Sequence, residues 1–294
     1  MIAAPPIEVF GTTFQNPILL ASGTAGFGRE LDDIVHLDRL GGIVTKSVSP
    51  EPRAGHPPPR VVEYDGGMLN AIGLANPGMD AVADRELPWL AANLRRARVL
   101  VSVVGNTVDE YVTVIRRLGS HAVAVAFELN LSCPNTDRGG EHFGANDAVL
   151  AELVRRCRDA SAKPVIAKLA PTLADIARTA AVAAEAGADG ITVVNTIPGT
   201  LFDPSTRPPA RPSARLGGEQ GGVSGPALLA VGVLATRRVR QATGLAVVGV
   251  GGVRTAGDVR QYLDAGATLV AVGTAGFMDP RIPERLAAAW ERGG

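Results

Sequence analysis

The chain has very little cysteine, few aromatic residues and no long apolar run. Its only two cysteines, Cys133 and Cys157, are too few for a disulfide framework, a zinc site or an iron-sulfur cluster held by this chain alone, so no metal site is predicted. No segment approaches the roughly 20 consecutive apolar residues that a membrane-spanning helix needs. The N-terminus lacks the features of a targeting signal. We therefore expect a cytoplasmic protein without a membrane anchor.

The chain also lacks an excess of either charge. Twenty-nine basic residues balance twenty-nine acidic ones, and no basic tract stands out, so neither nucleic acid nor an anionic membrane is an expected partner. Small molecules are the expected ligands. With 294 residues, 46% of them hydrophobic, the chain can bury a large core in one large domain or two ordinary ones.

Lysine is scarce: only Lys46, Lys163 and Lys168 accompany the many arginines. Lys46 and Lys168 each close an apolar, strand-like run, which would place an ammonium group at the carboxyl end of a strand. Such positions suit a buried point charge. Lys163, which precedes a proline between a helix and a strand, is interpreted as a surface residue.

Short β-branched runs alternate with helical segments rich in Ala, Leu and Arg. The predicted strands are residues 17–21, 42–46, 99–104, 122–130, 164–169, 189–195, 245–250 and 268–273. Eight apolar strands separated by helices predict a parallel (β/α)8 TIM barrel. A doubly wound open sheet is the alternative, but the first strand lacks the G-x-G-x-x-G turn of a dinucleotide fold.

Three segments depart from this alternation. Residues 47–78 and 197–225 are rich in proline and glycine and follow the second and sixth strands, so we expect them over the C-terminal face as a roof and a lid. Residues 7–17 predict an N-terminal hairpin that plugs the bottom of the barrel.

Polar side chains gather at the predicted carboxyl ends of the strands. They are Ser22, Lys46, Ser47, Asn106, Asn130, Lys168, Asn195 and Thr196, with Asn70 in the roof. Barrel closure would bring them together, and a cluster of amides suits a flat heterocycle with alternating donors and acceptors. The last two strands end in Gly251-Gly252 and Gly273-Thr274. We expect each to run directly into a helix and so to form a phosphate site.

Cys133 lies on a turn after the fourth strand, between Asn130 and Asn135, and is the candidate base or nucleophile. Cys157 lies in a helical pattern and is interpreted as a packing residue. A thiol base beside a phosphate-bearing hydride acceptor, such as flavin mononucleotide (FMN), would suit dehydrogenation next to a carbonyl group.

Several motifs resemble class 1 dihydroorotate dehydrogenases. They are Asn130-Leu-Ser-Cys-Pro-Asn135, Thr45-Lys46-Ser47, Asn70-Ala-Ile-Gly-Leu-Ala-Asn-Pro-Gly78, Ala167-Lys168-Leu169, Gly221-Gly-Val-Ser-Gly-Pro226 and the two glycine turns. The residues after Cys133 are most like those of the NAD-linked class 1B catalytic subunit. Residues 201–209 differ from the usual family pattern of the lid.

The resemblance implies a set of roles. Cys133 would remove the C5 proton of dihydroorotate while C6 delivers hydride to FMN, giving orotate for pyrimidine (UMP) synthesis. Residues 1–294 would form a single FMN-binding domain. The implied FMN contacts are Ser22, Lys46, Ser47, Asn106, Asn130, Lys168, Val194, Gly225, Gly251, Gly252, Gly273 and Thr274. The implied substrate contacts are Lys46, Asn70, Ala71, Ile72, Gly73, Leu74, Asn130, Asn135, Asn195 and Thr196.

The resemblance also implies partners. The chain would form a homodimer or, as in class 1B, a heterotetramer with a subunit that carries FAD and a [2Fe-2S] cluster and passes electrons to NAD. One alternative is a dihydropyrimidine dehydrogenase-like reductase acting on uracil or thymine. A second is a flavin-free aldolase that forms a Schiff base on Lys168. A third, a non-catalytic binding module, would leave Cys133 unexplained.

Overall fold

The structure is a computed structural model that describes residues 5–132, 134–135, 141–205, 214–218 and 220–293. Its centre is a closed barrel of eight parallel strands paired in sequence order, which confirms the barrel and excludes the open sheet. The barrel strands are β3 (Ile18–Leu20), β4 (Gly42–Val44), β7 (Arg98–Val103), β8 (Ala124–Asn130), β11 (Val165–Leu169), β12 (Gly190–Val193), β15 (Ala246–Val250) and β16 (Leu269–Val272). Only β7 begins outside its predicted range, by one residue.

The barrel strands are buried on both faces, as their near-continuous apolar sequences predict. On β8, for example, Ala126 belongs to the cluster inside the barrel, whereas its neighbour Phe127 packs in the outer core between strands and helices. Successive side chains on a strand point to opposite faces. This two-residue period therefore fixes which residues face the barrel interior, and with them the residues that can reach the mouth.

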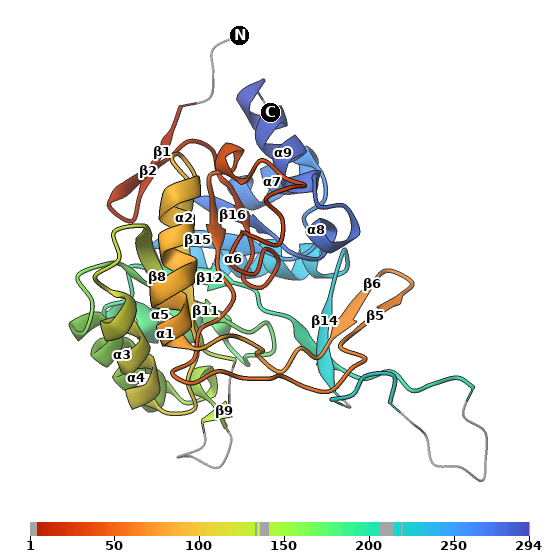
Figure 1. Ribbon diagram of the computed structural model, residues 1–294, viewed down its shortest axis with the longest axis horizontal. Helices are drawn as coiled ribbons and strands as arrows, with labels where there is room; N and C mark the ends of the chain where they lie inside the picture. Colours follow the sequence, from red (N-terminus) through yellow and green to blue (C-terminus); the bar gives the residue numbers. More distant parts are fainter. Residues whose placement is uncertain (1–4, 133, 136–140, 206–213, 219, 294) are drawn as a thin grey trace.

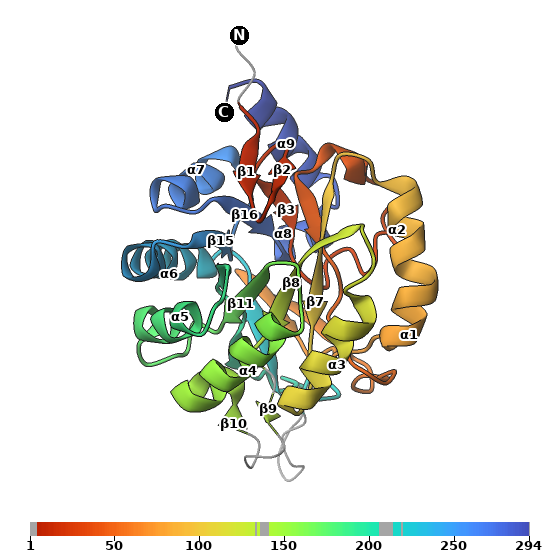
Figure 2. The ribbon, with the colours of Figure 1, turned by 90° about the vertical axis from the view of Figure 1, so that its left-hand side faces the viewer.

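The helices form a ring around the barrel, which Figure 2 views from the end that carries the N-terminal hairpin. They are α1 (Met79–Ala81), α2 (Leu87–Asn93), α3 (Val108–Leu118), α4 (Asp147–Asp159), α5 (Ile176–Glu185), α6 (Leu228–Thr243), α7 (Ala256–Asp264), α8 (Thr274–Met278) and α9 (Ile282–Glu291). A π-helical turn, η2 (Val82–Glu86), lies between α1 and α2. Two short 3-10 turns are η1 (Leu37–Arg39) and η4 (Phe143–Ala145). Side chains of Thr107, Asn146, Asp175 and Thr255 cap α3, α4, α5 and α7.

The connection after the first barrel strand departs from the expected alternation. Only turns and η1 join β3 to β4, and Gly23, Gly26 and Gly28 adopt positive φ angles there. Glycine reaches these angles without a steric penalty but is unfavourable inside a helix, so this glycine-rich sequence favours a folded loop.

The N-terminal hairpin consists of β1 (Ile7–Val9) and β2 (Thr12–Phe14). Phe10 and Phe14 pack in one cluster with inward-facing residues of the barrel, among them Leu100 and Ile166. The ring of Phe10 fills the space that a side chain at Gly190 would need, since a Cβ there would lie 2.6 Å from it. The prediction that the hairpin plugs the barrel is confirmed.

The roof and the lid join in a single sheet. Its four antiparallel strands are β5 (Val61–Tyr64), β6 (Gly67–Asn70), β13 (Ile197–Gly199) and β14 (Gly221–Ser224), in the order β13-β14-β6-β5. Figure 1 shows β5, β6 and β14 on the side of the barrel away from the hairpin β1–β2. A separate two-stranded ladder pairs β9 (Pro134–Asn135) with β10 (Glu141–His142). Within the described ranges, no helix has both the length and the apolar character needed to cross a membrane.

Candidate active site

Four polar side chains form a layer just inside the barrel mouth, which we call the polar floor: Ser102 on β7, Glu128 on β8, Lys168 on β11 and Thr192 on β12. Each stands two residues along its strand from a residue whose side chain faces the barrel interior or the plug, so the strand period directs it inward as well. Glu128, Lys168 and Thr192 are at least nine-tenths buried. The floor therefore separates the apolar plug from the mouth.

Glu128 is held from two sides on the polar floor. Its Oε1 lies 3.3 Å from the ammonium nitrogen of Lys168, and its Oε2 accepts a hydrogen bond of 2.9 Å from the hydroxyl of Thr192. Only 1% of Glu128 is exposed. A buried carboxylate without a partner costs several kcal/mol, so the ion pair and the hydrogen bond are what allow a charge at this depth.

Lys46 follows β4 and lies close to Lys168, as the strand ends predicted. Its backbone N-H donates to the carbonyl of Gly26 at 2.8 Å, and its Nζ would lie 3.5 Å from a Cβ placed on Gly23. Burial, and secondarily the charge of Lys168, lower the pKa of Lys46. The mouth thus holds two neighbouring ammonium groups, and an anion bound beside them would favour the protonated form of Lys46.

Hydroxyl groups connect the ends of the first three barrel strands. Ser22 donates to the carbonyl of Thr45 at 2.8 Å and lies 3.5 Å from Ser47, whose hydroxyl is 2.9 Å from that of Ser102. Ser47 in turn accepts a bond of 3.4 Å from the Asn130 amide. Ser22, Ser47 and Asn130 were each predicted as site residues, and the structure brings them together.

A second set of amide contacts continues across the mouth. Asn195 donates to Oδ1 of Asn130 at 3.3 Å and to the hydroxyl of Ser132 at 2.9 Å, while its own Oδ1 accepts the backbone N-H of Thr196 at 2.8 Å. The backbone carbonyl of Asn130 accepts a 2.6 Å bond from Tyr111. These hydrogen bonds therefore fix the orientations of the side-chain amides of Asn130 and Asn195 at the mouth.

Asn70 extends this arrangement into the roof. It lies at the end of β6, and its amide donates to the carbonyl of Gly222 on β14 at 3.1 Å. A Cβ on Gly222 would lie only 2.1 Å from the Thr196 hydroxyl, so β14 and Thr196 can approach this closely only because residue 222 is glycine. The roof, the lid and the barrel thus meet at two predicted site residues, Asn70 and Thr196, with Gly222 of β14 in contact with both.

The predicted substrate loop Ala71, Ile72, Gly73 and Leu74 follows Asn70. Its backbone is fastened to residues 56–60, since Ala71 N donates to the Arg60 carbonyl at 2.8 Å and His56 N donates to the Ile72 carbonyl at 3.1 Å. The side chain of Asn76 also bonds the Leu74 carbonyl at 2.8 Å and Ser49 after β4. These hydrogen bonds hold the backbone of the loop against the roof and against Asn76.

The two glycine turns differ from each other. Gly273 precedes α8 directly, as predicted, and no side chain caps this helix; Thr274 donates to Ser224 of β14 at 2.8 Å. The prediction that Gly251-Gly252 runs directly into a helix is wrong. Three residues follow before α7, whose first turn is closed by a capping box of Thr255 and Asp258.

Gly251 and Gly252 instead lie against the start of α6. A Cβ on Gly252 would meet the backbone nitrogen of Leu229 at 2.5 Å, and the Gly251 carbonyl accepts a 2.7 Å bond from Tyr262. Both glycines have positive φ angles, as does Gly225, where a Cβ would meet Gly67 at 2.8 Å. These glycines therefore allow close packing against neighbouring backbone, whereas a Cβ on Gly273 would meet only Ala21 among the described residues, at 3.8 Å, which leaves the space that a phosphate group requires.

The remaining predicted residues are placed as follows. Asn106 follows β7, and its backbone N-H donates to Glu110 at 2.8 Å. Val194 is buried and donates to the carbonyl of Val250 at 2.9 Å. Cys133 lies outside the described residues, as does the side chain of Asn135, so their roles stay predictions. Part of the unusual lid segment 201–209 lies outside them too.

Cys157 is a packing residue, as predicted. It is fully buried near the end of α4. Burial raises the pKa of its thiol to about 12, so it stays protonated near neutral pH and is a poor nucleophile.

Glu128, Thr192 and Ser102 belong to the site but were not predicted from the sequence. One signal was available: Glu128 is a carboxylate in an otherwise apolar strand, two residues before Asn130, and therefore on the same face. Thr192 and Ser102 carried no comparable signal, because both are common strand or surface residues.

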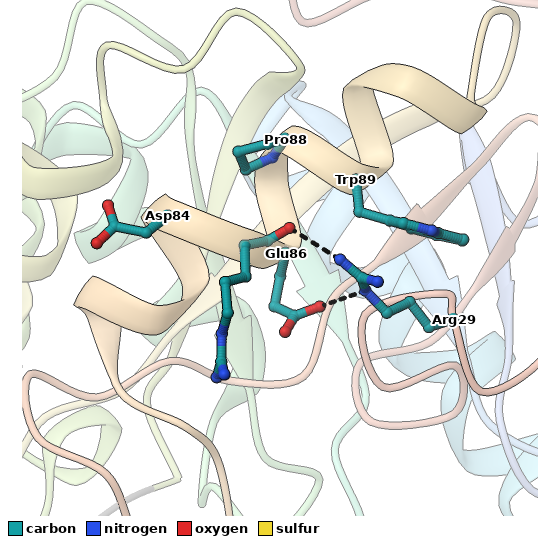
Figure 3. A pocket seen from close by; sticks show the side chains of 6 residues that line it. Arg29, Asp84, Glu86, Pro88 and Trp89 are labelled. Atoms are coloured by element: carbon teal, nitrogen blue, oxygen red, sulfur yellow. Dashed lines mark hydrogen bonds and ion pairs between the residues drawn. The ribbon is translucent and has the colours of Figure 1, made fainter.

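An open cavity of about 550 Å³ lies on the outer surface, away from the predicted site residues (Figure 3). The Arg29 guanidinium lies 5.2 Å from the centre of the Trp89 ring and pairs with Glu86 at 3.0 Å. Arg29 also donates to the carbonyl of Arg85 at 3.1 Å. These contacts fasten the loop after β3 to the start of α2, which is a structural role.

A family model and three similar proteins agree on one protein family. The family model for dihydroorotate dehydrogenase matches residues 6–291. Three similar proteins carry the description dihydroorotate dehydrogenase B (NAD(+)), catalytic subunit. The one from Geobacter sulfurreducens is 41% identical over 97% of this chain and 92% of its own length. The one from Geobacillus kaustophilus is 44% identical over 93% and 85%, and the one from Listeria welshimeri is 42% identical over 95% and 90%.

Proposed function

Because the chain belongs to the dihydroorotate dehydrogenase family, we propose that it oxidises (S)-dihydroorotate to orotate in pyrimidine (UMP) biosynthesis, in the cytoplasm. The single observation that supports this most directly is the fixed amide pair of Asn130 and Asn195 at the barrel mouth. Amides that both donate and accept match the alternating N-H and C=O edge of a pyrimidine ring. The two ammonium groups nearby suit the carboxylate of that substrate.

We propose FMN as the cofactor, one per chain, and residues 1–294 as a single FMN-binding domain. The glycine cradle of Gly225, Gly251, Gly252, Gly273 and Thr274 would hold the phosphate group, and Ser22, Lys46, Ser47, Asn106, Asn130, Lys168 and Val194 would contact the rest. When bound, the flavin supplies a hydride acceptor. The substrate would be held by Lys46, Asn70 to Leu74, Asn130, Asn135, Asn195 and Thr196.

The oxidation removes one proton and one hydride from neighbouring carbons of dihydroorotate. Cys133 is the proposed acceptor of the C5 proton, and the hydride leaves from C6, so that a C5=C6 double bond forms and orotate is released. The amides of Asn130 and Asn195 orient the ring. Roof and lid, joined in one sheet over the mouth, exclude water from the reacting carbons.

The test is anaerobic mixing of the purified protein with dihydroorotate, followed by the visible absorbance of the flavin. We expect bleaching with wild type, much slower bleaching with Cys133→Ala, and partial recovery of Cys133→Ser at alkaline pH, because a hydroxyl is a weaker acid than a thiol. Equal rates in wild type and Cys133→Ala would reject the proposed base. Bleaching or spectral shift with uracil alone would favour a dihydropyrimidine reductase. A colourless protein trapped by borohydride would favour a Lys168 aldolase.

The described relatives are named catalytic subunits. We propose, on this ground and on the small number of cysteines, that the chain passes electrons to NAD through a partner subunit with FAD and a [2Fe-2S] cluster, as a homodimer or within a heterotetramer. Purification from the native cell, with absorbance spectra for FAD and iron-sulfur, tests this. A homogeneous preparation that reduces NAD without any second polypeptide would contradict it.

A further inference from the structure

Glu128 is the one buried carboxylate of the polar floor, and the proposed chemistry gives it no role. It does not lie at the mouth itself, where substrate and cofactor would bind, but in the layer beneath. Its two oxygens are used separately: one pairs with Lys168 at 3.3 Å, and the other accepts from Thr192 at 2.9 Å. Lys168 comes from β11, which pairs with β8, and Thr192 comes from β12, the next strand of the barrel.

This geometry restricts Lys168 more than a surface ion pair would. The lysine has four rotatable side-chain bonds and would otherwise sample many positions at the end of its strand. Here its side chain is 9% exposed and its nitrogen points to a carboxylate whose own orientation is fixed by Thr192. A buried ion pair with one further hydrogen bond holds one geometry, because every alternative leaves a charge unpaired in the barrel interior.

The charges around Lys168 reinforce this restriction. In the described part of the mouth, the ionisable groups that face it are Glu128 from β8 and Lys46 after β4. Lys46 repels the Lys168 ammonium, whereas Glu128 attracts it. Without the carboxylate, the two like charges would push apart at close range in a poorly hydrated site.

We propose that Glu128 is a positioning residue: together with Thr192, it fixes the Lys168 ammonium in the place from which it contacts the cofactor. The inference rests on the proposed function in so far as Lys168 contacts FMN. Glu128 itself takes no part in proton or hydride transfer. Thr192 carries no charge and contributes to FMN binding only through the hydrogen bond that orients the Glu128 carboxylate.

The test is a set of FMN dissociation constants, measured by flavin fluorescence on flavin-stripped wild type, Glu128→Gln, Lys168→Met, the double variant and Thr192→Val. We expect Glu128→Gln to weaken FMN binding by about tenfold or more, but by less than about twofold when Lys168 is already methionine, since coupled residues are non-additive. Thr192→Val should weaken binding by about fivefold through one lost hydrogen bond to a charged group. Glu152→Gln, on the exposed face of α4, is the matched control and should bind FMN as wild type does.

The outcomes separate the inference from the proposed function. Wild type that fails to bind FMN would overturn the proposed cofactor and, with it, this inference. Wild type that binds FMN while Glu128→Gln binds equally well or more tightly would overturn the inference alone, because the carboxylate would then only reduce the positive charge. Two other results would also overturn the inference alone. One is an unchanged FMN affinity in Thr192→Val, and the other is a loss of FMN affinity from Glu128→Gln that is equally large with Lys168 and with methionine at position 168. Thermal unfolding of the flavin-free proteins controls for misfolding, and the double variant should unfold at a higher temperature than Lys168→Met because it no longer buries an unpaired carboxylate.

Discussion

Substituting alanine for Gly222 tests the closest contact between the lid and the barrel mouth. The new Cβ would lie 2.1 Å from the hydroxyl oxygen of Thr196 and 2.6 Å from its Cβ. Ordinary contacts need about 3.5–4.0 Å, so one side must move by more than an ångström. Overpacking of this kind costs about 1–3 kcal/mol. Gly222 also accepts the Asn70 amide, so the same movement strains the roof.

We expect Gly222→Ala to lower the free energy of unfolding by that amount and to raise the KM for dihydroorotate by about tenfold, because displacement of Thr196 would remove the one hydrogen bond that we propose it makes to the substrate. FMN affinity should change less, since Gly251, Gly252 and Gly273 of the proposed phosphate site follow other strands, β15 and β16. Urea unfolding and steady-state kinetics measure the two effects. In a Thr196→Gly background the hydroxyl and the Cβ that cause the clash are both absent, so most of the cost of Gly222→Ala in stability should disappear.

The matched control is Gly257→Ala in α7. A Cβ there has its nearest neighbour at 3.6 Å, and the position is helical, so alanine should stabilise the protein by about 0.5–1 kcal/mol. If Gly222→Ala unfolded like wild type with an unchanged KM, the close approach of β14 to Thr196 would not exist in solution. An equal loss of stability with and without Thr196 would refute the assigned cause.

Two further predictions concern the plug and the mouth. Phe14→Ala should lower the free energy of unfolding by about 3–5 kcal/mol, because the ring is fully buried at the closed end of the barrel; a loss under about 1 kcal/mol in urea unfolding would contradict its role as a plug. Burial and Lys168 lower the pKa of Lys46 below the 10.5 of free lysine. Between the lowered value and 10.5 the unfolded chain holds a proton that the folded chain has released, so the stability of the flavin-free protein should rise with pH in that window and lose this rise in Lys46→Met. Urea unfolding at stepped pH measures the slopes, and identical slopes would refute the assignment.

The barrel could be predicted from sequence because its strands are buried on both faces. Such strands are continuous apolar runs bounded by polar strand ends, so both the number of strands and the side that carries the site follow from the pattern. The roof sheet could not be predicted as readily. Its strands are short and partly exposed, and β14 contains two adjacent glycines, Gly221 and Gly222, which are unusual in strands. The Asp65-Gly66 pair between β5 and β6 was the one available hairpin signal.

The residues of the candidate site also divide into those that could be predicted from the sequence and those that could not. Lys46, Asn130 and Lys168 could be predicted because each interrupts an apolar run at a strand end. Thr192 could not, because its importance comes entirely from a contact with Glu128, 64 positions away in the chain. Sequence patterns report burial and local conformation, whereas the partners of a buried charge are fixed only when the barrel closes.

The charges at the mouth relate the two lysines, Lys46 and Lys168, to the expected anionic ligand. Lys46 and Lys168 contribute two positive charges, and Glu128 removes one, which leaves one net positive charge among the described groups of the floor and its rim. Lys168 already has a counter-charge within the protein, since its ammonium nitrogen lies 3.3 Å from Glu128. No carboxylate of the described residues forms an ion pair with Lys46, and burial lowers its pKa. An anion such as the proposed ligand orotate would therefore supply the missing counter-charge and favour the protonated form of Lys46. Binding of the substrate carboxylate and protonation of Lys46 should thus be coupled, with one lysine held in place by the protein and the other left for the ligand.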